Sequence, residues 1–292
     1  MRMRVLEFLV TEAEAGRMVK SIARNEIQLS YSQFTRLKFS GSVFLDGKNV
    51  HADVRVQAGQ KLTVVLTDTG AEMIPHDMPI DIAYEDEDYF VINKPAPLPT
   101  LCSVHQEGPT LENVLYAHLG CPADYVFRPV NRLDKGTSGL MAVARNAHAQ
   151  QLLQKKLHTD SFIREYRAIC QGQLPEKEGI ISLPIGKAGP GSRREMRPDG
   201  KEAITRDWGE EERNGFSLVR LRLQTGRTHQ IRVHMSAMDC PVAGDYLYGT
   251  PHEALPGRFA LHACMIRFIH PISGAEILLN SRLPEELQAL MN

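Results

Sequence analysis

The pattern of apolar and polar positions separates the first 67 residues from the rest of the chain. The spacing predicts helices over residues 17–25 and 30–38, followed by strands over 42–45, 53–56 and 61–66. Ser30 or Ser32 can cap the second helix, and Asp46-Gly47 is a strong signal for a hairpin turn. Residues 1–67 are therefore expected to form a small unit in which helices precede strands.

The next twelve residues read differently. Residues 68–79, DTGAEMIPHDMP, carry one glycine and two prolines among polar positions, which is typical of a linker. We therefore expect three parts: a small domain over residues 1–67, a linker over 68–79 and a larger domain over 80–292.

Strand-like runs dominate the larger domain. The pattern predicts a hairpin over residues 80–92, helices over 110–118 and 146–157, strands over 140–144, 161–170, 216–224, 259–268 and 277–280, and a terminal helix from Pro284 with Leu287 and Leu290 inward. Thr228 is expected to cap a further helix with Ile231, Met235 and Met238 on one face. Asn146 is expected to cap the helix over 146–157.

Composition adds limits on the class of protein. The chain has 292 residues, 42% of them hydrophobic and 24% charged, which is ordinary for a globular protein with more than one domain. It contains no apolar run of about 18 residues, and the N-terminus lacks the features of a signal peptide, so we expect a cytoplasmic protein without a membrane span. Five scattered cysteines form no CxxC pair, so neither disulfides nor a zinc site is indicated.

Charge is balanced overall but clustered locally. The net charge is −1, yet residues 186–206 are polar, are expected to form a loop, and hold the densest group of basic side chains: Lys187, Arg193, Arg194, Arg197, Lys201 and Arg206. A cationic loop suits contacts with nucleic-acid phosphates, which depend on the local face rather than on net charge. An ordinary solvated loop is the competing interpretation.

The stretch RPVNRLDKGTSGLMAVARN, residues 128–146, combines a charged turn with an apolar strand. This order places the carboxylate of Asp134 on a loop at the mouth of the strand over 140–144. A lone Asp between Arg and Lys is more often part of a solvated turn than of a reactive site. Two histidines further along the chain do not suggest a metal site, because His229 and His234 are five residues apart and have no acidic partner in an HExxH arrangement.

Several separated motifs give Asp134 a functional interpretation. RLDxxTSGL, TGRTHQIRVH, GDYLYG and LHA occur in this order between residues 80 and 283, and together they resemble the RluA family of RNA pseudouridine synthases. The family commonly has His before Arg-Leu-Asp, where this chain has Asn131. The resemblance implies an α+β fold with a mixed, largely antiparallel sheet, and an isomerase that converts uridine to pseudouridine in structured rRNA or tRNA without cofactor or metal.

The resemblance also implies roles for individual residues. Asp134 is the expected catalytic nucleophile or base, Arg232 its partner, and Tyr166 the ring that stacks on the uracil. Ile231 supports the pocket floor, and Arg132 helps to displace the target nucleotide. Lys94 can support the site or be an exposed lysine at a strand end. The group Lys187, Arg193, Arg194 and Arg197 is the expected contact with phosphates.

The small first domain is similar in layout to the RNA-binding domain named after ribosomal protein S-four. Arg36, Lys38 and Lys48 are its candidate phosphate contacts. Two alternatives remain for the whole chain, which is expected to be a monomer. It could be a non-catalytic RNA-binding or ribosome-assembly factor, or a nucleoside hydrolase or glycosidase, although no second carboxylate stands out as the partner that glycosidases use.

Overall fold

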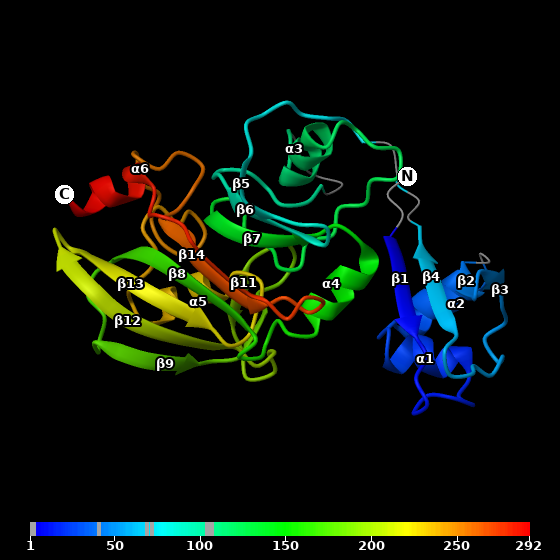
Figure 1. Cartoon of the computed structure of the whole chain (residues 1–292). Helices are drawn as coiled ribbons and strands as arrows, with labels where there is room; N and C mark the ends of the chain where they lie inside the picture. Colours follow the sequence, from blue (N-terminus) through cyan, green and yellow to red (C-terminus); the bar gives the residue numbers. More distant parts are fainter. Residues whose placement is uncertain (1–3, 40–41, 68–69, 71–72, 103–107) are drawn as a thin grey trace.

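The N-terminal unit is a four-stranded antiparallel sheet covered by two helices (Figure 1). The computed structural model describes residues 4–39, 42–67, 70, 73–102 and 108–292. The sheet order is β1-β4-β2-β3, with β1 at Arg4–Leu9, β2 at Val43–Leu45, β3 at Lys48–Asn49 and β4 at Lys61–Leu66; the helices are α1, Val19–Asn25, and α2, Tyr31–Phe39. The unit has its own apolar core, which includes Val19, Ile22, Leu37, Leu62 and Val64.

Local sequence signals account for most of this unit. Ser30 caps α2, because its hydroxyl accepts a hydrogen bond from the Gln33 backbone N–H (3.2 Å) while the Gln33 side chain accepts one from the Ser30 N–H (2.9 Å). Asp46 and Gly47 both have positive φ, 48° and 78°, and turn β2 into β3 as predicted.

One expectation for this unit was wrong, and one strand was not predicted. Strand β1, which pairs with β4 along its whole length, was not predicted. The predicted strand over residues 53–56 is not a strand: the carbonyls of Ala52 and Val54 accept hydrogen bonds from the first N–H groups of α1, so this segment completes the helix instead of joining the sheet.

The larger unit is built on a nine-stranded sheet of order β5-β6-β7-β14-β8-β13-β12-β9, with β15 paired to β14. The strands are β5 (Asp81–Glu85), β6 (Tyr89–Lys94), β7 (Ser138–Ala144), β8 (Phe162–Gln171), β9 (Glu178–Ser182), β12 (Ile204–Arg213), β13 (Phe216–Leu223), β14 (Leu261–Ile269) and β15 (Glu276–Asn280). Among the strands of the described residues, only β7 and β14 pair in parallel, over a short register. The predicted α+β class with a mixed, largely antiparallel sheet is therefore confirmed.

Short helices flank this sheet: α3 (Leu111–His118), α4 (Ala147–Gln154), α5 (Gln230–Ala237) and α6 (Glu285–Gln288), followed by a 3-10 turn at Ala289–Met291. Asn146 caps α4 as predicted, since its side-chain oxygen accepts from the Ala149 N–H, although the helix ends at Gln154. Thr228 does not cap α5. His229 precedes that helix in a left-handed conformation (φ 59°), and the side-chain oxygen of Gln230 accepts from the Arg227 N–H.

The basic segment expected to be a loop contains a hairpin. Strand β10 (Ile185–Lys187) pairs with β11 (Arg194–Met196), and Lys187 lies opposite Arg194. The segment Ala188-Gly189-Pro190-Gly191 lies between them, with positive φ at both glycines, so the turn residues that suggested a loop connect two very short strands. Strands β9 and β12 on either side were not predicted either.

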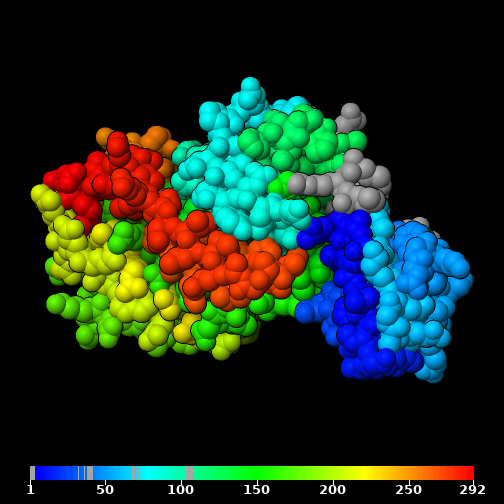
Figure 2. All heavy atoms as spheres, viewed as in Figure 1, coloured from blue at the N-terminus to red at the C-terminus, as the bar shows by residue number. Residues whose placement is uncertain are grey.

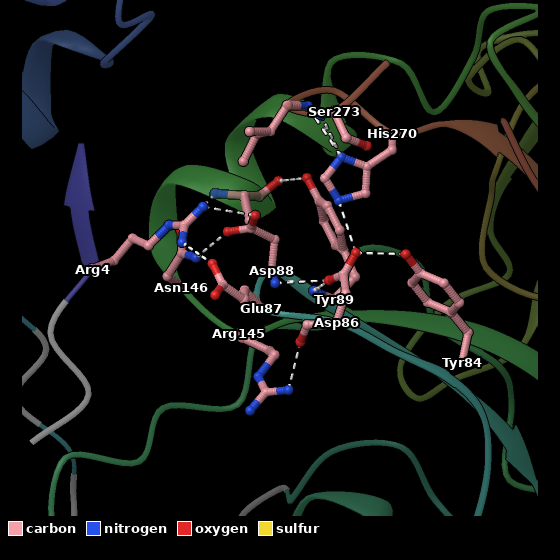
Figure 3. Close-up of polar contacts among 12 residues, drawn as sticks. Arg4, Tyr84, Asp86, Glu87, Asp88, Tyr89, Arg145, Asn146, His270 and Ser273 are labelled. Atoms are coloured by element: carbon pink, nitrogen blue, oxygen red, sulfur yellow. Dashed lines mark hydrogen bonds and ion pairs between the residues drawn. The ribbon is translucent and has the colours of Figure 1, made fainter. Parts of the chain in front are cut away.

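The two units meet at the turn between β5 and β6. Arg4 of β1 reaches across to Glu87 (2.6 Å) and Asp88 (3.0 Å), and the amide of Asn146 donates to the other oxygen of Asp88 (3.0 Å), as Figure 3 shows. The side chain of Gln151 on α4 bonds the Gln28 carbonyl and the Ser30 N–H of the small unit. In the space-filling view the small unit is a separate lobe against the larger body (Figure 2).

No helix among the described residues is long and apolar enough to cross a membrane. All five cysteines are free thiols; Cys170, Cys240 and Cys264 are buried and Cys102 and Cys121 are exposed. The proposed linker can be followed only in part, because residues 68, 69, 71 and 72 lie outside what is described. The side chains of two candidate phosphate contacts of the small unit, Arg36 and Lys38, also lie outside it. Lys48 is exposed on β3.

Candidate active site

Asp134 lies on the loop that leads into β7, and neighbouring chain segments fix this loop from several sides. The Thr100 hydroxyl donates to the Leu133 carbonyl (2.7 Å), and the Leu98 N–H donates to the Lys135 carbonyl (3.0 Å). The ammonium group of Lys94, which is only 1% exposed, donates to the carbonyls of Pro95 and Leu98. Lys94 is therefore not an exposed lysine; it supports the segment on which the Asp134 loop rests.

Gly139 explains why this loop enters the sheet where it does. Its φ is 107°, and a β-carbon there would lie 2.3 Å from the carbonyl oxygen of Ala263 on β14. Only glycine permits this approach of β7 to β14. The parallel contact at Ser138 and Gly139 thus sets the position of the residues just before it, including Asp134.

Arg232 on α5 connects Asp134 to a second carboxylate. Its Nη1 lies 3.2 Å from Oδ2 of Asp134, while Nε and Nη2 donate to the two oxygens of Asp245 at 2.6 and 2.8 Å. Asp245 is fully buried and also accepts from the N–H groups of Leu247 and Tyr248. The bidentate pair holds the guanidinium plane, and one remaining N–H group faces Asp134.

Aromatic rings enclose this arginine. The guanidinium carbon lies 4.1 Å from the ring centre of Phe259 and 4.9 Å from that of Tyr248. Burial alone would lower the pKa of Arg232, but the hydrogen bonds and charges of Asp245 and Asp134 outweigh it and raise the pKa above its ordinary value. Arg232 is therefore a fixed, permanently charged group beside the carboxylate.

His229 approaches Asp134 from the turn before α5. Its Nε2 lies 3.9 Å from Asp134 Oδ2, and its Nδ1 is 2.8 Å from the hydroxyl of Tyr248. Since that hydroxyl already accepts from the Arg194 N–H, its own hydrogen can be donated to Nδ1, which places the imidazole hydrogen on Nε2. Burial lowers the pKa of His229 despite the nearby Asp134, so the ring is neutral at pH 7.

The second histidine considered for a metal is used differently. His234 is buried and bonds the Thr205 hydroxyl and the Leu183 carbonyl. Within the described ranges, no group of three or more His, Cys, Asp or Glu side chains is arranged to hold a metal ion.

A cleft of about 720 Å³ opens in front of Asp134. Tyr166 on β8 lines it, is only 4% exposed, and has its pKa raised by burial. A smaller pocket next to the cleft has Asp134, Tyr166, Ile231 and Arg232 in its wall, so the structure brings these four predicted residues together. Arg132 is exposed at the rim, and no hydrogen bond or ion pair ties its side chain to any described residue.

The backbone of the basic hairpin β10–β11 contacts this site. The Arg194 N–H donates to Tyr248, and the guanidinium of Arg193 lies 5.8 Å from the centre of the Tyr248 ring. Lys187 and Arg193 are exposed and Arg194 is half-buried. Arg197 is not free in the same way, because it forms a bidentate pair with Asp199 and a longer pair with Glu195.

Sequence reasoning missed Asp245, Tyr248 and His229 as parts of the site. The first two belong to the segment GDYLYG, to which the resemblance gave no residue roles. The signal that could have found them is a short loop carrying one acidic and two aromatic residues shortly after the basic helix α5.

Comparison with known proteins agrees with the fold and with the motifs. The family described as RNA pseudouridylate synthase matches residues 88–237. The uncharacterized RNA pseudouridine synthase YlyB of Bacillus subtilis is 35% identical over 96% of this chain and 94% of its own length. Ribosomal large subunit pseudouridine synthase D of Xanthomonas campestris is 34% identical over 97% of this chain and 91% of its own length.

A solved structure shows the same architecture. Human RNA Pseudouridylate Synthase Domain Containing 1 superimposes with a TM-score of 0.58 at 27% identity, over 72% of this chain and 86% of that chain. The fold is therefore that of the pseudouridylate synthases. The chain belongs to the RNA pseudouridylate synthase family, as its resemblance to the RluA family predicts, and it is an isomerase that acts on uridine in RNA.

Proposed function

We propose that Asp134 is the catalytic carboxylate that converts uridine to pseudouridine in this enzyme. The observation that carries the proposal is its position: among the described residues it is the one acidic side chain that lines the cleft, and Arg232 holds it at 3.2 Å. An isomerisation needs a single carboxylate to act on the ribose or on the ring, whereas glycosidases use two.

The chemistry balances within the substrate. The bond from ribose C1′ to uracil N1 breaks, the base turns, and a bond from C1′ to C5 forms. C5 loses its proton and N1 gains one, so no electron and no group leaves the nucleotide. Asp134 acts as nucleophile or as base in this sequence, and Arg232 stabilises its anionic form before and after the step.

The other residues hold the nucleotide. Tyr166 presents its ring to the uracil, and Ile231 forms the floor of the pocket. Arg132 has no partner among the described residues and extends from the rim, where it can take the place of the uridine when that nucleotide leaves its helix. Lys187, Arg193 and Arg194 contact the backbone of the same RNA, with Arg197 contributing less because Asp199 occupies it.

We further propose that the substrate is ribosomal RNA rather than transfer RNA. Relatives from Xanthomonas campestris and Vibrio vulnificus, 34% and 35% identical, are named ribosomal large subunit pseudouridine synthase D. The enzyme would act as a monomer in the cytoplasm, without metal or cofactor, and the unit containing α1 and α2 would add RNA-binding surface.

The test is turnover with ribosomal RNA by the wild type, by Asp134→Asn and by Asp160→Asn, which changes an exposed carboxylate outside the cleft. We expect Asp134→Asn to bind RNA as the wild type does and to form no pseudouridine, with Asp160→Asn fully active. Turnover by Asp134→Asn would refute the assignment. Release of free uracil by the wild type would indicate a hydrolase, and binding without any product would indicate a non-catalytic factor.

A further inference from the structure

Arg164 is a buried arginine that has no counterion within the described part of the chain. It lies on β8, is 7% exposed, and no carboxylate comes within 4.0 Å of its guanidinium among the described residues. Its Nη2 makes one long hydrogen bond, 3.4 Å, to the Leu157 carbonyl, and its Nε is buried without a partner. The guanidinium lies 5.7 Å from the centre of the Phe162 ring, which compensates only part of the cost of burying a charge.

The same side chain lines the cleft in front of Asp134. Arg164 and Tyr166 are two residues apart on a regular strand, so their side chains leave the same face, about 7 Å apart. Glu165 and Arg167 do not line the cleft: Glu165 pairs with Arg222 and Arg167 pairs with Glu210. Alternation along β8 thus gives the cleft an arginine and an aromatic ring while the adjacent charges are neutralised elsewhere.

Basic side chains share the cleft with Arg164, and a glycine lies next to its guanidinium. Among the described residues, four basic side chains line this cleft, Arg132, Lys135, Arg164 and Arg227, against the one carboxylate of Asp134. At Gly226 a β-carbon would lie 3.3 Å from the His158 ring and 3.7 Å from Nη1 of Arg164, so the absence of a side chain there leaves the guanidinium approachable.

We propose that Arg164 binds a phosphate of the RNA backbone that flanks the target uridine. The inference rests on the proposed function, because it assumes that the uracil lies at Tyr166. A phosphodiester supplies the anion that Arg164 lacks, and a guanidinium can bind two of its oxygens at once. Tyr166, which holds the base, and Arg164, which holds the backbone of the same nucleotide, are then two residues apart along β8.

The experiment combines protein and RNA changes. The probe is a ribosomal RNA hairpin around one uridine that the wild type converts, made with a single neutral methylphosphonate at either linkage flanking that uridine. Binding is measured for the wild type, Arg164→Gln, Arg164→Lys and the control Arg167→Gln, which removes an equal charge from the other face of β8. All variants are first checked for wild-type melting behaviour.

We expect Arg164→Gln to bind the natural hairpin roughly tenfold more weakly, with Arg164→Lys in between and Arg167→Gln unchanged. At one of the two linkages the methylphosphonate should weaken the wild type by the same factor and leave Arg164→Gln unaffected. If both linkages weaken the wild type and Arg164→Gln equally, the proposal is wrong. Binding of the wild type to the two modified hairpins can be compared without any variant. If Arg164→Gln has a folding defect, Arg164→Lys takes its place in the comparison.

A second measurement tests the phosphate contact of Arg164 independently of the catalytic role proposed for Asp134. Binding to polyuridylate is followed against salt concentration, which requires no catalysis. Loss of one phosphate contact should reduce the slope of log affinity against log salt by about 0.7 in Arg164→Gln. An unchanged slope would refute the phosphate contact even if Asp134→Asn is inactive, and a reduced slope would support it even if Asp134→Asn is active.

Discussion

At the scale of single residues, Asp245 determines where Arg232 points. Two of the three N–H···O contacts that hold the guanidinium go to Asp245, at 2.6 and 2.8 Å, and only the 3.2 Å contact goes to Asp134. Asp245 is buried completely and does not line the cleft, so it is a positioning residue rather than a catalytic one.

Asp245→Asn should therefore lower kcat roughly a hundredfold while the KM for RNA stays near that of the wild type, because a small displacement of Arg232 misplaces the reacting carboxylate. Loss of a buried charge partner should also reduce the free energy of unfolding by about 3 kcal/mol. Steady-state kinetics and urea unfolding measure the two effects. The control is Asp199→Asn, which breaks an exposed pair with Arg197 and should leave both unchanged. A folded Asp245→Asn with normal kcat would contradict the positioning role.

Lys94 makes stability depend on pH. Burial lowers the pKa of its ammonium group to about 7 in the folded protein, against 10.5 in the unfolded chain. Between these values the unfolded chain binds more protons, so the free energy of unfolding rises with pH, by at most about 1.4 kcal/mol per pH unit. Below pH 7 both states are protonated, and the contribution is constant.

Lys94→Met should remove this rise. The carbonyls of Pro95 and Leu98 lose their donor, which lowers stability at every pH by a constant amount. Urea unfolding of both proteins at pH 7, 8 and 9 should show that the free energy of unfolding of the wild type rises with pH relative to that of Lys94→Met. Parallel curves would mean that Lys94 does not change its protonation state on folding.

At the scale of elements, the hairpin β10–β11 carries basic side chains with different freedom. Lys187 and Arg193 are exposed without a carboxylate partner among the described residues, whereas Arg197 is paired with Asp199. Replacing both Lys187 and Arg193 by Gln should weaken binding to all RNA sequences alike and reduce its salt dependence. Arg197→Gln is the matched change and should have a smaller effect. Equal losses in the two proteins would show that the pairing with Asp199 opens when RNA binds.

Elements with a strong local signal could be predicted, and those fixed by distant contacts could not. Asn146 and Ser30 cap helices through hydrogen bonds three residues away, so the sequence reveals them. The segment at 53–56 has the alternation of a strand, but the carbonyls of Val54 and of the preceding Ala52 accept hydrogen bonds from the first N–H groups of α1. Strands β10 and β11 are three residues long and each has one large apolar residue, so their periodicity carries no information.

The residues of the site also fall into those that the sequence predicts and those that depend on distant contacts. Asp134, Tyr166 and Arg232 could be named from motifs, and the structure places them around one pocket. Asp245 could not, because its bond to Arg232 depends on how the GDYLYG loop folds back on α5. Arg164 was passed over because the lack of a partner is visible only when the surrounding side chains are in place.

At the scale of the whole molecule, the small unit is attached to the wall of the catalytic cleft. Gln150 and Gln154 of α4 line the cleft, while Gln151 of the same helix bonds Gln28 and Ser30 of the small unit. Arg4 adds a second attachment through Asp88, which also bonds Asn146 at the start of α4 (Figure 3). The position of the small unit is thus linked to the helix beside the RNA.

Arg4→Ala should loosen this attachment, because it leaves the buried Asp88 without its cation. We expect faster hydrogen exchange in the first turns of α2 and α4, a broader distance distribution in small-angle scattering and weaker RNA binding. Lys61→Ala is the control, since its pair with Glu7 lies within the small sheet. Identical exchange and scattering in wild type and Arg4→Ala would show that Arg4 does not hold the units together.

The proposal made for Asp134 is that this chain uses it to make pseudouridine in cellular RNA. The most direct measurement is sequencing of RNA after pseudouridine-specific chemical labelling, in cells with the protein, without it, and with Asp134→Asn in its place. We predict that the same ribosomal RNA positions lose their label in the deletion and in the Asp134→Asn cells. Positions lost in the deletion but kept with Asp134→Asn would contradict the claim and indicate that the protein acts without that carboxylate.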